Sequence, residues 1–289
     1  MRTTSALFMS LVLAGAPAAH SVPSPAGAVQ QPREYVYREI DGQKLKAFVF
    51  VPPAGIPGGR TSAVLLIHGG AWTMGSASWT FEAARRFAAM GLVAISVDYR
   101  LSQGGVTPIE AVDDVRAAFR WARRHAAEFR IDPRRVAGYG VSAGGQLVTV
   151  AAQVDVPGDG IDAASPKPDL LLLWSPAVHA PTHLLEGREG APDQSPMRRA
   201  GAATPPACIV NGDKDTVTPP QDAGEFRDRV VRAGGVCELH VYPGVGHLLT
   251  RNLANQLSDF DPDPEHQADG FARFERFLRE RGYLPAKEI

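Results

Sequence analysis

Ser142 has the surroundings of a residue that does chemistry. It lies in a Gly-x-Ser-x-Gly pattern, with Gly140 two positions before it and Gly144 two positions after it. A serine at the tip of a sharp turn between a strand and a helix needs neighbours without side chains, because the two elements approach closely there. Residues 135–139 are expected to form a short strand, and residues 146–154 continue as a helix. We therefore interpret Ser142 as a nucleophile on a strand-to-helix turn.

Two further residues could activate that serine, since a hydroxyl is a poor nucleophile until a base accepts its proton. His247 follows the expected strand 236–242 on a glycine-containing loop, and it is the candidate base. Asp215 follows the expected strand 207–211, and it is the candidate acid that fixes the imidazole tautomer. Asp213 is an alternative acid, because it lies one strand period away. The order serine, acid, histidine differs from that of both familiar protease triads.

A glycine-rich stretch after another expected strand could stabilise the negative charge of a reaction intermediate. The chain reads His-Gly-Gly-Ala-Trp from His68 onward. The backbone amides of Gly70 or Ala71, together with that of Ala143, are the candidate oxyanion-hole donors. We interpret His68 as a structural residue that holds this loop by hydrogen bonds.

Aromatic and acidic residues complete the set of candidates. Trp72 and Trp174 are candidate substrate-binding residues, although tryptophan is equally common in protein cores. Asp98 and Arg100 are interpreted as a structural pair. The acidic residues between 259 and 265 alternate with Phe and Pro and do not have the spacing of a calcium loop. We expect neither a metal nor a cofactor.

The elements that must position these residues alternate between strand and helix. Residues 34–40 and 44–51 alternate in polarity around Asp41-Gly42, which indicates an antiparallel hairpin. The remaining pattern predicts a mostly parallel, doubly wound α/β sheet of about eight strands. In such sheets ligands bind beyond the carboxyl ends of the strands. Further strands are expected at 63–67, 92–97 and 170–174, and helices at 80–90, 108–129, 221–232 and 265–280.

The bulk composition is that of an ordinary globular protein. The chain has 289 residues, 44% hydrophobic and 21% charged, with a formal net charge of -1. This length suits one large α/β domain, here residues 29–289. The charge balance favours neither nucleic acid nor acidic lipid as a partner. The composition leaves the oligomeric state open.

The N-terminus has the pattern of an export signal. Arg2 precedes an apolar run over residues 6–16 and then small residues, so residues 1–28 are interpreted as a cleavable signal peptide and leader. The mature protein would begin near Val29 and be periplasmic or secreted, without stable membrane insertion. Two cysteines, Cys208 and Cys237, are expected at the starts of neighbouring strands, where good disulfide geometry is uncommon. Two buried thiols are the favoured interpretation over a disulfide.

Together these motifs resemble those of the α/β-hydrolase esterases, especially the bacterial feruloyl and acetyl esterase-like group and the hormone-sensitive-lipase family. The resemblance runs from about Val36 to Leu284. Two features depart from the pattern: Ala71 stands where many relatives have a third glycine, and the segment from Leu248 to Glu265 is longer than usual. The motifs that support the resemblance are His-Gly-Gly-Ala-Trp at 68–72, Val-Asp-Tyr-Arg-Leu at 97–101, Gly-Val-Ser-Ala-Gly-Gly at 140–145, Asp-Thr-Val-Thr-Pro at 215–219 and Gly-Val-Gly-His at 244–247.

The resemblance implies a serine carboxylesterase that hydrolyses short-chain or aromatic acyl esters, of acetyl or feruloyl type, through an acyl-enzyme. Its expected partner is a small ester or an acylated saccharide. It also favours Asp215 over Asp213 as the acid, because of the Asp-x-Val-x-Pro run. Residues 175–204, which lack clear periodicity, are expected to form a cap or lid. Two alternatives stay open: an amide hydrolase similar to the arylformamidases, which share the His-Gly-Gly-x-Trp loop, and a binding protein without catalysis on the same fold.

Overall fold

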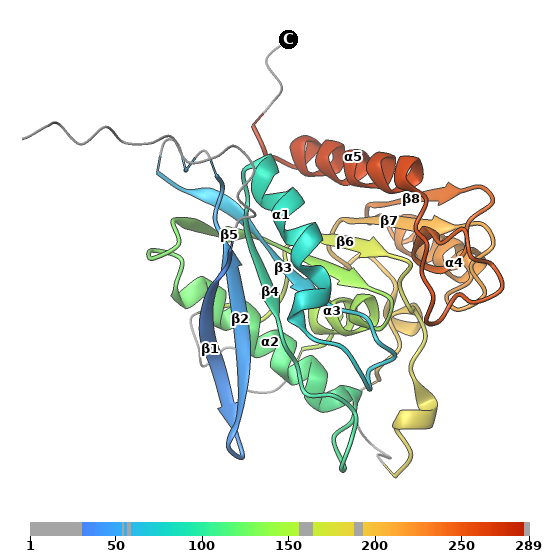
Figure 1. The fold of residues 1–289 in the computed structure, drawn as a ribbon, viewed down its shortest axis with the longest axis horizontal. Helices are drawn as coiled ribbons and strands as arrows, with labels where there is room; N and C mark the ends of the chain where they lie inside the picture. Colours follow the sequence, from blue (N-terminus) through green and yellow to red (C-terminus); the bar gives the residue numbers. More distant parts are fainter. Residues whose placement is uncertain (1–30, 54, 57–58, 156–163, 188–192, 286–289) are drawn as a thin grey trace, which may run out of the picture.

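An eight-stranded sheet forms the centre of the molecule. The computed structural model describes residues 31–53, 55–56, 59–155, 164–187 and 193–285 (Figure 1). The expected signal peptide therefore lies outside the described residues. The spatial order of the strands is β1-β2-β4-β3-β5-β6-β7-β8. The strands are β1 (Arg33–Ile40), β2 (Gln43–Phe50), β3 (Thr61–Ile67), β4 (Val93–Val97), β5 (Ile131–Val141), β6 (Leu171–Trp174), β7 (Ala207–Gly212) and β8 (Cys237–Tyr242).

The sheet is antiparallel at one edge and parallel elsewhere. β1 and β2 form the expected hairpin, whose turn places Asp41 and Gly42 at positive φ. β2 also pairs antiparallel with β4, and every later pair is parallel. All residues of β4, β6 and β7 are buried, as expected for strands covered on both faces. The predicted mostly parallel, doubly wound sheet is confirmed.

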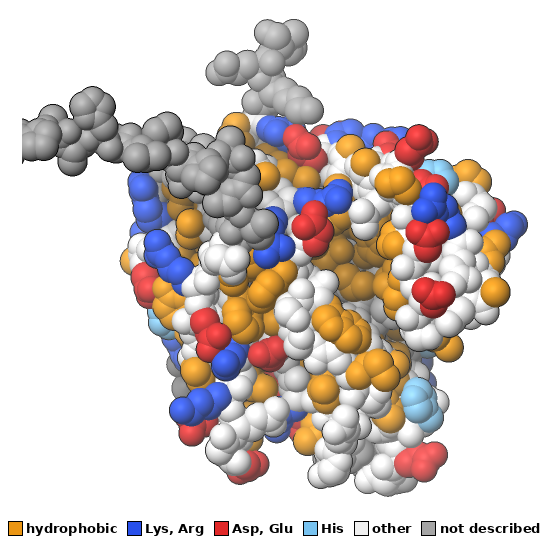
Figure 2. Space-filling model, in the orientation of Figure 1, with side chains coloured by type: hydrophobic (Ala, Val, Ile, Leu, Met, Phe, Trp, Pro, Cys, Tyr) orange, Lys and Arg blue, Asp and Glu red, His pale blue; other side chains and the backbone are white. Residues whose placement is uncertain are grey.

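Helices cover both faces of this sheet (Figure 1). α1 and α5 supply aromatic side chains to the core on one face, while α2, α3 and α4 complete the core on the other. Figure 2 shows the α1 and α5 side, where a hollow floored by hydrophobic side chains lies between α1 and the segments around β8. The helices are α1 (Phe81–Met90), α2 (Pro108–Arg124), α3 (Ala143–Gln153), α4 (Pro220–Arg232) and α5 (Pro264–Glu280).

The start of α2 agrees with the sequence prediction, but its end does not. Thr107 caps the helix in a capping box with Glu110, and Pro108 occupies the first turn. The helix ends at Arg124 instead of continuing to residue 129. The chain must turn here because the next strand already begins at Ile131, which is paired with β3. The helical spacing of apolar residues continues through this turn, so the sequence pattern does not show where the helix ends.

The segment expected to form a lid, residues 175–204, contains two short 3-10 helices, Thr182–Leu184 and Met197–Arg199, in its described part. None of the described helices is both long and apolar enough to cross a membrane. The parallel strands β3, β5, β7 and β8 end at the same edge of the sheet, so the loops that follow them meet there.

Candidate active site

Ser142 lies at a sharp turn between β5 and α3, as the sequence predicts. Its backbone is in an unfavourable conformation, with φ 51° and ψ -117°. A side-chain carbon at Gly140 would lie 2.6 Å from the carbonyl oxygen of Gly144, and one at Gly144 would lie 2.2 Å from that of Ile67. Both positions therefore require glycine. The N–H of Ser142 donates to the carbonyl oxygen of Trp174 at 3.0 Å, which fixes the turn to the neighbouring strand.

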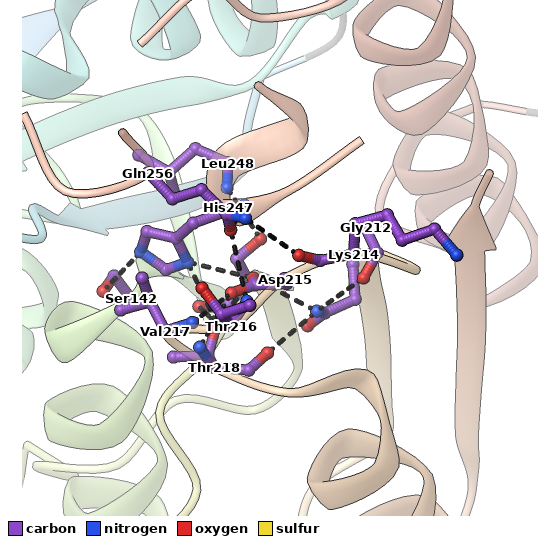
Figure 3. Close-up of polar contacts among 12 residues, drawn as sticks. Ser142, Gly212, Lys214, Asp215, Thr216, Val217, Thr218, His247, Leu248 and Gln256 are labelled. Atoms are coloured by element: carbon purple, nitrogen blue, oxygen red, sulfur yellow. Dashed lines mark hydrogen bonds and ion pairs between the residues drawn. The ribbon is translucent and has the colours of Figure 1, made fainter. Parts of the chain in front are cut away.

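The loop after β8 brings His247 between the serine and an acid (Figure 3). Its Nε2 lies 3.0 Å from Ser142 Oγ, and its Nδ1 lies 2.9 Å from Asp215 Oδ2. The imidazole is buried, as is the carboxylate. This is the geometry in which Nδ1–H donates to the acid and Nε2 accepts the serine proton. The structure therefore brings together three residues from three separate loops in a continuous hydrogen-bonded chain.

Asp215 is held as an ionised acceptor. Its Oδ1 accepts from the backbone N–H groups of Val217 and Thr218, and its Oδ2 accepts from the Thr218 hydroxyl. Burial raises the pKa of this carboxyl, but hydrogen bonds and charge from His247, with the Thr218 bonds, hold the pKa of Asp215 below its ordinary value. Asp213, the alternative acid, instead accepts from the backbone N–H of Gly244 in the turn after β8.

Two polar side chains at this site escaped the sequence analysis. The Thr218 hydroxyl lies 3.1 Å from His247 Nδ1 as well as against Asp215. The Gln256 side chain accepts from the backbone N–H of His247 at 2.9 Å. Thr218 belongs to the Asp-x-Val-x-Pro run, so its nearness was available from the sequence. Gln256 has no local signal, because its partners are backbone atoms 9, 40 and 42 residues away along the chain.

The glycine-rich loop after β3 passes directly over the serine. A side-chain carbon at Gly69 would lie 3.3 Å from Ser142 Cβ. Within the described residues, the backbone N–H groups of Gly70, Ala71 and Ala143 donate no hydrogen bond, so they are free to bind a ligand oxygen. Ala71 has φ 50°, in the left-handed region that a glycine adopts without strain.

His68 supports this loop from the buried side. Its ring is buried, stacks on Tyr99 at 4.2 Å, and binds the Gly69 carbonyl oxygen through Nδ1 at 2.6 Å. Because a carbonyl only accepts, Nδ1 has the proton. Burial lowers the pKa of His68, which favours the neutral ring. These contacts agree with a structural role for this histidine.

The two candidate substrate-binding tryptophans lie in different places. Trp72 lies beside a pocket of about 220 Å³, and its Nε1 donates to Gln146 Oε1 at 2.9 Å. Ser142 and His247 do not line this pocket, but they lie next to it: the N–H of Ala177, a lining residue, donates to the Ser142 carbonyl oxygen at 3.0 Å, and the hydroxyl of Thr218, another lining residue, lies 3.1 Å from His247 Nδ1. Other lining residues are Val178, His179, His183, Val217, Thr218 and Pro219.

Trp174, in contrast, does not reach the pocket, and the expectation that it binds substrate is wrong in this structure. Its side chain is 4% exposed and packs against Phe271 and Phe274 of α5, with ring centroids at 5.1 and 5.7 Å. The physical reason is the alternation of side chains along β6, which directs Trp174 to the α5 face together with Leu172.

One group of residues that could hold a metal ion occurs in the described part of the chain: Cys208, Glu238 and His240 on β7 and β8. The Glu238 carboxylate already binds Arg276 at 3.0 Å and His240 at 3.2 Å, so this group is satisfied without a cation. Cys208 and Cys237 are both free thiols. Since Cys208 pairs with Glu238 in the register, the two thiols point to opposite faces of the sheet and cannot bond.

Comparisons with known proteins agree with this architecture. Residues 64–194 match the protein family described as alpha/beta hydrolase fold. A carboxylesterase of Mycobacterium tuberculosis, NlhH, is 38% identical over 130 residues, which are 44% of this chain and 39% of that protein. An acetylxylan esterase of Xylanibacter ruminicola is 27% identical over 271 residues, 83% of this chain and 53% of that protein. The chain thus spans well under two thirds of these curated relatives.

Solved structures are similar over more of their length. Esterase 2 of Thermogutta terrifontis, phosphorylated by paraoxon, has a TM-score of 0.77 and 28% identity, over 90% of this chain and 97% of that chain. The same esterase with butyrate bound has a TM-score of 0.76 and 26% identity, over 90% of this chain and 98% of that chain.

Proposed function

We propose that this chain, which has the α/β-hydrolase fold and resembles esterases of that fold, is a serine carboxylesterase that acts through an acyl-enzyme. The observation that supports this most directly is the hydrogen-bonded chain from Ser142 Oγ through His247 to Asp215. The expected resemblance to α/β-hydrolase esterases is confirmed by the comparisons, and the reaction follows from the geometry of the site.

In the first half of the reaction, His247 Nε2 takes the proton of Ser142 as Oγ attacks the ester carbonyl carbon. The carbonyl π electrons move to oxygen, and the resulting oxyanion lies against the N–H groups of Ala143 and of Gly70 or Ala71. Asp215 stabilises the imidazolium without taking its proton. When the tetrahedral intermediate collapses, the ester C–O bond breaks and the imidazolium gives its proton to the leaving alcohol.

The second half repeats these steps with water. His247 takes a proton from the water as its oxygen attacks the acyl carbon, and the imidazolium then returns a proton to Ser142 Oγ as the carboxylic acid leaves. The N–H groups that held the first oxyanion hold the second one. No other group of the protein has to change its charge, since burial keeps His68 neutral and the acid stays ionised.

The pocket beside the serine favours a short acyl group. Its volume of about 220 Å³ lies below the range of about 300–1,000 Å³ that is usual for drug-sized ligands. Trp72 and Val217 give it apolar walls that suit a short chain or a single ring, and His179 and Asp222 give it a polar edge. Acetyl or feruloyl groups, on a plant polysaccharide or on a small alcohol, are our proposed substrates.

We also propose that the protein is periplasmic or secreted, with residues 1–28 removed, and that residues 175–204 cap the site within one domain of residues 29–289. The first proposal is tested by fractionating cells that express the full chain and sequencing the N-terminus of the product. A mature chain that begins near Val29 outside the cytoplasm supports export, and an uncleaved cytoplasmic chain contradicts it.

The catalytic proposal is tested with p-nitrophenyl esters from acetate to palmitate, together with methyl ferulate and N-formylkynurenine. Wild type, Ser142→Ala and Ser78→Ala are compared, the last being the same change at an exposed serine. Turnover that favours acetate or butyrate, disappears in Ser142→Ala and persists in Ser78→Ala is the expected result. If the wild type hydrolyses none of the esters, the esterase proposal fails, and cleavage of the formamide alone would assign an amide hydrolase.

A further inference from the structure

The loop of residues 250–262 leads from the histidine to α5, and at one position it buries a polar side chain while leucines nearby are exposed. Gln256 is 7% exposed, whereas its neighbours Leu253 and Leu257 are 45% and 73% exposed. A polar side chain is buried in proteins at a cost of about 1–3 kcal/mol unless it is hydrogen-bonded. The hydrogen bonds of one amide, and not burial of the leucines, therefore dock this loop against the site.

That amide joins the two loops that supply the acid and the base (Figure 3). Gln256 Oε1 accepts from the N–H of His247 at 2.9 Å and from the N–H of Thr216 at 3.2 Å, so both of its lone pairs are used. Gln256 Nε2 donates to the carbonyl oxygen of Lys214 at 2.9 Å. The residues on either side of Asp215 are thus tied to the backbone of His247 through a single side chain.

Close packing limits the ways in which this side chain can be replaced. A side-chain carbon at Gly246 would lie 2.4 Å from Gln256 Cδ, so the amide lies directly on the backbone before the histidine. No other residue type combines this length with both an acceptor and a donor in one plane.

The backbone at the histidine needs such a support because it is strained. Leu248 and Leu249 have φ 56° and 61°, in the left-handed region. Each non-glycine residue held there costs about 1–3 kcal/mol and persists only when its surroundings fix it. Besides Gln256, a hydrogen bond from the N–H of Leu248 to Ser175 Oγ at 3.1 Å holds this turn.

The loop closes on itself independently of Gln256. Thr250 and Pro262 form a β-bridge, and Arg251 binds Asp261 at 2.7 Å at its neck. Asn252 Nδ2 donates to Asp259 Oδ2 at 2.9 Å and so holds the loop internally. Asn252 therefore offers a matched control, because its loss loosens the same loop without touching either catalytic loop.

We propose that Gln256 is a positioning residue that sets the distance between Asp215 and His247 by joining the backbones of their two loops. This proposal rests on the esterase function proposed above. Without the amide, the strained turn at the histidine relaxes, and the imidazole loses its alignment with the acid and the serine. A misplacement of about 1 Å at a catalytic group costs about 100-fold in rate.

The test compares Gln256→Met, Gln256→Glu and Asn252→Ala with wild type on p-nitrophenyl butyrate, at a temperature where near-ultraviolet circular dichroism shows each variant folded. Methionine keeps the length and removes all three hydrogen bonds, whereas glutamate keeps the acceptor. We expect kcat to fall about 10- to 100-fold in Gln256→Met with KM within about twofold. Gln256→Glu should recover part of that loss, and Asn252→Ala should keep kcat within about twofold.

A second measurement is independent of turnover. The low-field proton resonance of the imidazole N–H between His247 and Asp215 should be present in wild type and Asn252→Ala and lost to exchange in Gln256→Met. Unchanged kcat and an unchanged resonance in Gln256→Met would overturn the proposal, as would equal losses in Asn252→Ala. If the wild type hydrolyses no ester, the esterase function fails, and the resonance alone then decides whether Gln256 positions the histidine.

Discussion

The acid of the catalytic chain allows a sharp test through Asp215→Asn, a change of one atom. Oδ1 of Asp215 accepts two backbone N–H groups, whereas Oδ2 accepts from side chains, among them the Thr218 hydroxyl and His247 Nδ1. An asparagine will therefore place its oxygen at the backbone donors and its NH₂ at the Oδ2 position. The Thr218 hydroxyl tolerates this arrangement, because it also donates to the Ser175 carbonyl oxygen at 3.0 Å.

His247 does not tolerate the change in the same way. Facing an NH₂ group, its Nδ1 must become the acceptor, and the ring proton then lies on Nε2. Because Nε2 points at Ser142 Oγ at 3.0 Å, the proton occupies the position that should receive the serine proton. The same inversion of tautomer in a serine protease lowers kcat about 10⁴-fold, which is about 5.5 kcal/mol at 1.36 kcal/mol per factor of ten. We expect a loss of about 10³- to 10⁴-fold here.

The assay is kcat for p-nitrophenyl butyrate on the pH-independent plateau, with Asp213→Asn as the matched control. Asp213 uses its Oδ1 to accept from Gly244, and an asparagine oxygen can replace that contact, so the control should stay within about twofold of wild type. If Asp215→Asn retained more than about a tenth of the activity, the assignment of the acid would be refuted. A larger loss in the control would move the acid to Asp213.

Three further predictions concern stability and reactivity. Gly144→Ala should destabilise the fold by about 3 kcal/mol or more in urea unfolding, because the new side-chain carbon would lie 2.2 Å from a backbone oxygen. Gly224→Ala in α4, whose new carbon meets only a side chain at 3.9 Å, should stabilise the fold by about 0.5–1 kcal/mol. The opposite order of stabilities would contradict the glycine argument. Because the pKa of Asp215 is lowered in the folded protein, its contribution to stability is complete above its ordinary pKa of 3.8 and is lost as the pH falls through the lowered value. In urea unfolding between pH 5 and 2, the free energies of unfolding of wild type and Asp215→Asn should therefore converge as the pH falls. Burial raises the pKa of both Cys208 and Cys237, which makes their thiols unreactive in the folded protein. A chromogenic disulfide reagent should detect no thiol before denaturation and two afterwards. Fast reaction of the native protein would refute their burial.

The positions of the proposed catalytic residues could be predicted from the sequence because each one follows the end of a strand. Parallel strands end at one edge of the sheet, so Ser142, Asp215 and His247 were expected on loops at that edge. The choice between Asp213 and Asp215 did not follow from strand parity, since both have the same parity. It depends on the turn after β7, in which Asp213 binds the neighbouring turn at Gly244.

Contacts between distant segments are what the sequence analysis missed. The expected pair of Asp98 and Arg100 does not form: Arg100 binds the buried Asp114 of α2 at 2.8 Å, and Asp98 accepts from the backbone N–H of Ala77 at 2.8 Å. Spacing along the chain cannot reveal such partners, because the strand and the helix that supply them dock only in the folded state. Trp174 was misplaced for a related reason. Its residue type made it a candidate for binding substrate, but its position on β6 directs its side chain to the α5 face of the sheet.

Trp174 also links the chain's order of synthesis to the completion of the site. Its carbonyl oxygen holds the N–H of Ser142, while its ring is wedged against Gly270, where a side-chain carbon would lie 2.8 Å from the indole. Among the described elements, α5 follows every strand of the sheet, so it is synthesised after all of them. The helix that packs on the indole is thus the last described element to be synthesised, and through Trp174 it contacts the strand end that holds the serine turn.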